Sequence, residues 1–355
     1  MKIVELAPDL HAINSIANNA IYSHVATLSD GLADIGHDVQ VFCSEESVSR
    51  ANIHTSTLPL SKLEMPESIK RHHTFTHIAK AFEFAKKEKV DIIHSHFTLL
   101  SSFFYRLVDI PTILSIHSPI SEEIKPFIDN YKDCRYVSFS LAQRKQMPQL
   151  NWIANIYHGV DTSVFSFESE PEEYMLYLGR VTEEKGVHFA IETAKATGIP
   201  LKIAGPSYPA EGYWHKQIEP FVDGKLIQYV GHVNFFEKIK LLQKAKVVLF
   251  PTMYNEAFGY VLIEAMSCGT PVIGFGNGSV PEIIKDNKTG YVVNNVQAMI
   301  EAVGKIDRID RKVVRKRAED LFSLKKMITG YERVFKRVIE ERAFKKQKSQ
   351  EKADK

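Results

Sequence analysis

Two acidic residues, Glu256 and Glu264, flank the tripeptide Ala257-Phe258-Gly259 in the stretch YNEAFGYVLIEAMSCG. On one helix, side chains eight positions apart would differ in direction by about 80°. We therefore expect Glu256 in a loop and Glu264 between one and two turns inside a helix that begins near Phe258. The backbone N–H groups of Ala257, Phe258 and Gly259 would then lie at a helix N-terminus, where they can bind an anion.

A carboxylate on each side of a phosphate site suits a ligand of the sugar-phosphate-sugar type, because carboxylates accept hydrogen bonds from pairs of hydroxyl groups. The alternative is that Glu256 is an acid that caps the helix and Glu264 is a solvated helix residue. These two residues alone leave both interpretations open.

Two basic residues follow an earlier apolar run, YMLYLG. Arg180 comes directly after this candidate strand, and Lys185 with Gly186 opens the next helix. Arg180 can bind a phosphate through two N–H groups and Lys185 can add a point charge. The alternative is a solvated pair on a loop, which loses weight beside the anion site proposed above.

No metal-binding motif accompanies these residues. The chain has no Asp-x-Asp at a strand end, and the pair His94 and His96 is the nearest approach to ligand spacing. For this pair we expect packing at the end of a strand. We therefore predict no metal and no cofactor, so that Arg180, Lys185 and the helix N-terminus neutralise a leaving diphosphate.

Two further segments lie at the carboxyl ends of candidate strands. His117 closes the run PTILSIH and is the best-placed polar group of the first half, although a lone histidine there is more often structural. The segment GFGNGSVPEIIK is a poor dinucleotide fingerprint, because Ser279 stands where a third glycine is required. We expect Gly278 and Ser279 in a turn whose backbone groups reach the ligand.

The elements that position these residues alternate along the chain. Short runs rich in Val and Ile alternate with longer amphipathic stretches, which predicts parallel βαβ units, and the pattern occurs twice. The acidic segment from Ser166 to Tyr174 separates the two runs and is typical of a linker. The fold class is therefore α/β, with two doubly wound, Rossmann-like parallel-sheet domains that face a cleft at the carboxyl ends of their strands.

The bulk properties narrow the function classes. With 355 residues, 44% of them hydrophobic, and a net charge of +2, the chain has the composition of a two-domain globular protein and no global affinity for nucleic acid. Its three cysteines lie far apart, which favours a reducing compartment over disulfides or zinc. Neither a signal peptide nor an apolar run long enough to span a bilayer is evident, so we expect a cytoplasmic protein.

Taken together, the segments resemble the retaining glycosyltransferases of family 4, which have the GT-B fold. YLGRVTEEKGV is similar to the donor-phosphate segment of that family, and YNEAFGYVLIEAMSCGTPVI to its two glutamates with seven residues between them. GSVPEII and TGYVV resemble the loop and strand that follow, and IYHGVDTSVF resembles the segment that leads into the interdomain linker. The resemblance covers nearly the whole chain and is strongest from Tyr174 to Val293.

The resemblance implies a domain arrangement. Residues 1–168 would form the acceptor domain and residues 169–322 the nucleotide-sugar donor domain. A last helix, 323–341, would return to the N-terminal domain. The tail beyond it, 342–355, is Lys-rich and nearly free of apolar residues, so we expect it to be disordered, with at most weak peripheral membrane contact.

The resemblance also implies residue roles. Arg180 and Lys185, with the amides from Ala257 to Gly259, would hold the donor diphosphate. Glu264 would bind the ribose of the nucleotide, Glu256 would hold the transferred sugar and His117 would contact that sugar.

One loop departs from the family pattern. A glycine pair is common there before the first helix, close to the donor phosphates, whereas this chain has Asn18 and Asn19 near that place. Their side-chain amides could replace backbone donors, or their bulk could alter the choice of donor or acceptor.

The function that we expect is retaining, metal-independent transfer of a hexose from a UDP-, GDP- or ADP-linked sugar to an acceptor that the sequence does not specify, in carbohydrate biosynthesis. The alternatives are a GT-B nucleotide-sugar epimerase and a non-catalytic protein that binds sugar nucleotides. The joint presence of Arg180, Lys185, Glu256 and Glu264 favours transfer.

Overall fold

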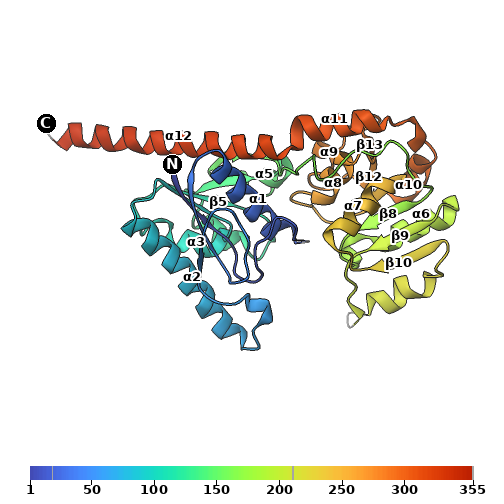
Figure 1. Ribbon diagram of the computed structural model, residues 1–355, viewed down its shortest axis with the longest axis horizontal. Helices are drawn as coiled ribbons and strands as arrows, with labels where there is room; N and C mark the ends of the chain where they lie inside the picture. Colours follow the sequence, from blue (N-terminus) through green and yellow to red (C-terminus); the bar gives the residue numbers. More distant parts are fainter. Residues whose placement is uncertain (18, 210–211, 354–355) are drawn as a thin grey trace. The chain divides into compact units, whose positions relative to one another are not determined.

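The computed structural model describes residues 1–17, 19–209 and 212–353, which form two compact units. The first unit (unit 1) is built from Met1–Phe139, Arg144–Ile156 and the last helix. The second (unit 2) is built from Ser140–Gln143 and Tyr157–Ser323. Figure 1 shows the elements of each unit, many of them labelled.

The sheet of unit 1 is parallel, and within the described chain its strands follow the order β3-β2-β1-β4-β5-β6-β7. Its central strands are buried on both faces, as their Val- and Ile-rich sequences require. The strands are β1 (Lys2–Leu6), β2 (Asp38–Cys43), β3 (Asn52–Thr55), β4 (Ile92–Ser95), β5 (Thr112–Ser115), β6 (Arg135–Ser138) and β7 (Trp152–Asn155).

Helices cover both faces of this sheet. On one face, Val4, Leu6 and Ile93 pack with Ile78 and Phe82 in an apolar cluster. On the other face α12 runs along α1, so closely that a Cβ atom at Gly31 would lie 2.0 Å from the Ile328 side chain (Figure 1). The helices are α1 (Ala20–Asp34), α2 (Glu67–Lys87), α3 (Thr98–Tyr105), α4 (Lys125–Asp129) and α12 (Leu324–Ala353). Helix α5 (Leu141–Gln146) begins in unit 2 and ends in unit 1.

Unit 2 has a second parallel sheet, with the order β10-β9-β8-β11-β12-β13 in the part of the chain that is described. The strands are β8 (Met175–Leu178), β9 (Leu201–Ala204), β10 (Ile227–Gly231), β11 (Val247–Phe250), β12 (Val272–Phe275) and β13 (Gly290–Val293). Its helices are α6 (Val187–Thr197), α7 (Phe235–Lys244), α8 (Tyr260–Ser267), α9 (Val280–Ile283), α10 (Val296–Val303) and α11 (Arg311–Phe322). Helix α6 packs with α10, and α8 packs with α7 and α11.

Local sequence signals begin several of these helices. Asn234 caps α7, where its side chain accepts hydrogen bonds from two backbone N–H groups and Glu237 completes a capping box. Asn19 caps α1 by accepting a hydrogen bond from the N–H of Ile21. The predicted α/β class with two doubly wound parallel sheets is confirmed.

Two boundaries differ from those predicted. The chain passes from unit 1 to unit 2 after Ile156, earlier than the limit expected at residue 168, because the intervening segment packs on unit 2. There the Arg315 guanidinium donates to the backbone oxygens of Thr162 and Phe165. Helix α12 continues to Ala353, so most of the tail that was expected to be disordered is helical.

Composition explains the long last helix. Beyond residue 341 it is rich in Lys and also contains Gln and Ala, which have high helix propensity even when they bury nothing. No helix within the described residues is both long enough and apolar enough to cross a membrane.

Candidate functional site

The chemistry-bearing residues of unit 2 lie where its strand order reverses. Strands β8 and β11 are neighbours, yet the chain runs from β8 to β9 and β10 on one side and then crosses over to β11 on the other side of β8. Arg180 follows the end of β8, and the loop with Glu256 follows the end of β11. In open parallel sheets the carboxyl ends of the strands at such a reversal form the usual ligand site.

Lys185 and Glu256 meet in this place. The Lys185 Nζ lies 2.5 Å from Glu256 Oε2, and the two side chains are only 15% and 13% exposed. The Tyr254 hydroxyl donates to the same carboxylate oxygen over 2.8 Å. The Lys185 ammonium also lies 4.7 Å from the centre of the Tyr254 ring, a favourable cation–π distance. Residues 71 positions apart thus form one compact cluster of opposite charges.

Two glycines hold the loops that carry this cluster. Gly186 has a φ of +72°, and a Cβ atom there would lie 2.1 Å from the backbone oxygen of Pro251. Gly278 has a φ of +55°, and a Cβ atom there would lie 2.3 Å from the backbone oxygen of Glu256. Any larger residue would push the loops apart, so the spacing between Lys185 and Glu256 depends on both glycines.

The loop around Ser279 supports Glu256 from a third side. The Ser279 backbone N–H donates to the Glu256 backbone oxygen over 3.0 Å. The Ser279 hydroxyl is buried, and no described residue provides a hydrogen-bond partner for it. Gly278 and Ser279 therefore support the Glu256 loop, and their expected contact with a ligand stays a prediction.

Burial and charge keep the tyrosines of this cluster neutral. Burial, followed by the neighbouring Glu256 carboxylate, raises the pKa of Tyr254 well above its ordinary value of 10. Burial likewise raises the pKa of Tyr177, whose hydroxyl donates to the Arg180 backbone oxygen over 2.7 Å. Both phenols are hydrogen-bond donors at neutral pH.

The start of α8 presents backbone donors beside Glu256. The cap residue is Gly259, and its position receives no side-chain hydrogen bond. Among the described residues, none accepts a hydrogen bond from the backbone N–H groups of Ala257, Phe258 or Gly259. These groups and the positive end of the helix dipole suit an anion.

Glu264 has a partner of its own. It lies in the second turn of α8 and is 7% exposed, and its Oε1 lies 2.6 Å from the Nζ of Lys238 on α7. The second carboxylate oxygen retains its lone pairs for further hydrogen bonds. The alternative interpretation, in which Glu256 caps the helix and Glu264 is solvated, is thus wrong on both counts. Gly259 is the helix cap, and Glu264 is buried. Glu256 lies in the loop, as predicted.

Arg180 is the least restrained member of this set. Its guanidinium lies 3.0 Å from Glu184, and both side chains are 51% exposed. An exposed pair of this kind costs little to break. The guanidinium can therefore exchange Glu184 for a phosphate.

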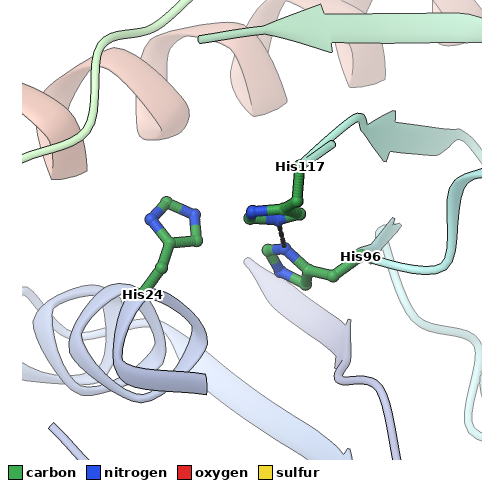
Figure 2. Close-up of side chains that lie close together, drawn as sticks. All are labelled: His24, His96 and His117. Atoms are coloured by element: carbon green, nitrogen blue, oxygen red, sulfur yellow. Dashed lines mark hydrogen bonds between the residues drawn. The ribbon is translucent and has the colours of Figure 1, made fainter. Parts of the chain in front are cut away.

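In unit 1, His117 belongs to a chain of buried hydrogen bonds. The Nε2 of His117 lies 2.7 Å from Nδ1 of His96, and Figure 2 shows this pair with the ring of His24 facing it. The Nε2 of His96 lies 3.0 Å from a carboxylate oxygen of Glu5. Nδ1 of His94 lies 2.9 Å from that same oxygen and 3.1 Å from the other oxygen of Glu5. Glu5 is fully buried, as is His94.

These histidines come from three elements. His24 belongs to α1, His96 follows β4 and His117 follows β5, and one ring nitrogen of each lies within 4.8 Å of those of the others. Such a group has the donors to hold a metal ion, although sequence spacing had suggested only the pair His94 and His96. The expectation of a protein without metal stays a prediction.

The loop before α1 carried the remaining predicted contacts. Asn19 is exposed and its side chain caps α1. Asn18 lies outside the described residues. The expectation that these amides replace the glycine pair of related proteins stays a prediction.

Sequence reasoning missed Tyr254, Lys238 and Glu5. Tyr254 stands two positions before Glu256, so its presence in the same loop was a readable signal. Lys238 lies on a helix and Glu5 in a strand, and the local sequence around each gives no sign of a buried partner. Only the tertiary packing reveals that each pairs with a buried group.

Comparison with known proteins places this geometry in context. Residues 22–165 match the family model described as Glycosyltransferase Family 4, and residues 161–319 match the model described as Glycosyl transferases group 1. An uncharacterized glycosyltransferase of Methanocaldococcus jannaschii is 24% identical over 322 residues, which cover 76% of this chain and 80% of the relative. Glycogen synthase of Mycobacterium tuberculosis is 25% identical over 321 residues, or 75% and 77% of the two chains.

A solved structure agrees with the fold. The crystal structure of Anabaena HepE in complex with UDP and glucose matches with a TM-score of 0.74 at 15% identity, and the match covers 95% of this chain and 99% of that one.

Proposed function

Because the chain belongs to the family 4 glycosyltransferases of GT-B fold, we propose that it moves a hexose from a nucleoside-diphosphate sugar to an acceptor hydroxyl with retention of configuration and without metal. The observation that carries the proposal is the cluster of Lys185, Glu256 and Tyr254 beside the open amides at the start of α8. This place brings together a cation, a carboxylate that can accept hydrogen bonds from sugar hydroxyls, and backbone N–H groups that can donate to an anion.

The donor diphosphate would bind at the start of α8. The amides from Ala257 to Gly259 would donate to its oxygens, and the ammonium of Lys185 has two N–H donors beyond the one directed at Glu256. Arg180 would leave Glu184 and bind the diphosphate through two N–H groups. These donors stabilise the negative charge that grows as the diphosphate departs.

The two carboxylates would bind the two ends of the donor. Glu256, held by Lys185 and Tyr254, would accept hydrogen bonds from hydroxyl groups of the hexose. Glu264, held by Lys238, would accept from the ribose through its second oxygen. HepE, whose fold this chain shares, has been crystallised with UDP-glucose, which supports a nucleotide-sugar as the donor.

The chemical step needs no enzyme nucleophile. The bond from the anomeric carbon to the phosphate oxygen breaks, and the acceptor oxygen bonds to that carbon on the same face. The proton of the acceptor hydroxyl passes to the departing diphosphate. His117 would contact the hexose from unit 1.

The test is release of nucleoside diphosphate from UDP-, GDP- and ADP-sugars, with cell extract as the source of acceptor. We expect release with one class of donor, and its loss in Glu256→Gln but not in the matched control Glu192→Gln on the exposed side of α6. A monomeric epimer formed without release of diphosphate would overturn transfer in favour of an epimerase. Binding of the nucleotide-sugar without either reaction would indicate a non-catalytic binding protein.

Retention is tested on the product. The NMR coupling constant of the new anomeric proton should match the anomer of the donor, and the opposite anomer would contradict the proposed stereochemistry.

A further inference from the structure

The last turns of α12 carry a cluster of basic residues on an exposed helix. Figure 1 shows this end of α12, in red, extending past the other elements of unit 1. All the side chains of residues 343–352 are exposed. One acid, Glu351, stands among five basic residues, which are Arg342, Lys345, Lys346, Lys348 and Lys352. The positive charge of this segment is therefore accessible to a surface outside the fold.

The helix places three of these lysines on one side. Positions three and seven apart on an α-helix differ in direction by about 60° and about 20°. Lys345, Lys348 and Lys352 therefore form one stripe, which is about 10 Å long because each residue adds about 1.5 Å. The acid nearest to this lysine stripe on the same side is Glu341, one turn before Lys345, and it pairs with Arg337 over 3.8 Å.

A neighbouring side of the same turns is anchored to unit 1. The side chains of Arg342 and Lys346 lie 3.1 and 2.6 Å from a carboxylate oxygen of Asp109, in the loop between α3 and β5. The centre of the lysine stripe lies about 100° around the helix from these two residues. The anchor therefore fixes the rotation of α12 and leaves the lysine stripe accessible.

Exposed apolar side chains accompany this charge. Phe344 is 57% exposed, and the Nζ of Lys348 lies 4.5 Å from the centre of its ring. Leu107 lies in the loop that Arg342 and Lys346 bind, and at 73% it is the most exposed large apolar side chain of the described residues. The interface of a lipid bilayer accepts such side chains beside basic ones, whereas a hydrated anionic polymer offers them no apolar environment.

We propose that the end of α12 is a docking surface for an anionic lipid bilayer, with the lysine stripe against acidic headgroups and Phe344 in the interface. Clusters of about four to eight basic residues on a helix are typical of segments that bind acidic lipids. In a disordered tail these lysines would point in all directions, whereas the helix holds them on one side. The proposal does not depend on the transfer reaction.

The measurement is co-sedimentation of the full chain with lipid vesicles. One set of vesicles contains phosphatidylcholine alone, and the other contains equal parts of phosphatidylcholine and phosphatidylglycerol. We expect binding to the acidic vesicles only, and its loss in about 1 M NaCl, where the Debye length is about 3 Å. Equal binding to both sets, or no binding to the acidic set at low salt, would overturn the proposal.

A triple variant isolates the lysine stripe. Lys345→Gln, Lys348→Gln and Lys352→Gln together remove its charge, and Gln retains the helix propensity of Lys. Each lysine near an acidic membrane contributes about fivefold to the affinity, so the loss should be on the order of 100-fold. An equal loss in a matched control would attribute binding to net charge alone and contradict the proposal. That control removes the same charge from exposed lysines of unit 2, through Lys216→Gln, Lys285→Gln and Lys288→Gln.

A substitution at Phe344 distinguishes a bilayer from other anionic partners. Phe344→Gln leaves every charge in place and should weaken binding to the acidic vesicles about fivefold or more, because the apolar contact with the interface is lost. Phe127→Gln is the matched control, since Phe127 is also 57% exposed and belongs to unit 1. Unchanged vesicle binding in Phe344→Gln would contradict the bilayer as the partner. Tighter binding of the wild type to duplex DNA than to acidic vesicles, at equal phosphate concentration, would do the same.

Discussion

At the scale of single residues, the ion pair of Lys185 and Glu256 is the centre of the candidate donor site. Lys185→Met should lower kcat/KM by roughly 10- to 150-fold, because a charge-assisted contact of about 1.5–3 kcal/mol to the diphosphate is lost and Glu256 loses a partner. The measurement is steady-state kinetics with the preferred donor. Lys195→Met, the same change at an exposed position of α6, should keep wild-type rates. An equal loss of activity in this control would contradict a specific role of Lys185 in donor binding.

Arg180 offers a different test, because its resting partner is dispensable. Arg180→Ala should cost about 1.5–3 kcal/mol of transition-state stabilisation, or roughly 10- to 150-fold in kcat/KM, with little change in stability. Glu184→Ala removes only the exposed resting partner and should preserve activity. An unchanged rate in Arg180→Ala would exclude this residue from the site.

The sequence was sufficient to select the candidate residues of the donor site but not the residues that hold them in place. Arg180, Lys185 and Glu256 stand at strand ends within short segments, so residue type and local position were informative. Lys238 and Glu5 act across elements on partners 26 and 91 positions away, and no local pattern encodes such pairs.

At the scale of elements, the glycine turn at residue 278 sets the position of the Glu256 loop. Gly278→Ala should weaken binding of the nucleotide-sugar at least about tenfold, because its Cβ would overlap the backbone of Glu256. Gly224→Ala is the matched control, since Gly224 also has a positive φ, +71°, but has open space around it. Isothermal titration with the donor measures both, and equal effects would attribute the loss to backbone strain alone.

The strands could be predicted well because buried parallel strands are short runs of Val and Ile. The exception is β3, whose four residues, Asn-Ile-His-Thr, form a half-exposed edge strand without such a run. The end of α12 was missed for the opposite reason. Its last turns have helix propensity but no apolar stripe, and the prediction relied on the stripe.

At the scale of the whole molecule, three buried histidines of unit 1 make the stability of the fold depend on pH. Burial lowers the pKa of His77, His94 and His96, so below about pH 6.5 the unfolded chain binds more protons than the folded one. Stability present above that pH is therefore lost as the pH falls. Each histidine that stays neutral in the fold contributes a loss of about 2 kcal/mol between pH 7 and pH 5.

Two buried acids act in the opposite direction. Burial raises the pKa of Glu5 and Asp9, so the folded form takes up their protons more readily. With the histidines in the majority, the urea midpoint should be lower at pH 5 than at pH 7. An equal or higher midpoint at pH 5 would contradict this balance.

Removal of metal is the complementary whole-molecule test. We expect dialysis against EDTA to leave transfer activity intact, because cationic side chains and backbone amides neutralise the diphosphate in the proposed site. Loss of activity that Mg²⁺ restores would contradict metal independence. A loss restored only by Zn²⁺ would instead direct attention to His24, His96 and His117.

The return of the last helix to unit 1 has a consequence for biosynthesis. Tyr331, whose hydroxyl forms a hydrogen bond with Ser115 on the sheet that begins with β1, is synthesised after the whole of unit 2. On the ribosome, the first sheet therefore waits with Glu5, His94 and one side of α1 uncovered until the final helix emerges. A chain that stops early, by a nonsense mutation or by proteolysis, would contain every residue of the candidate donor site and still lack a finished first unit. Helix α12 thus makes completion of the N-terminal unit depend on synthesis of the whole of unit 2 and of the helix that follows it.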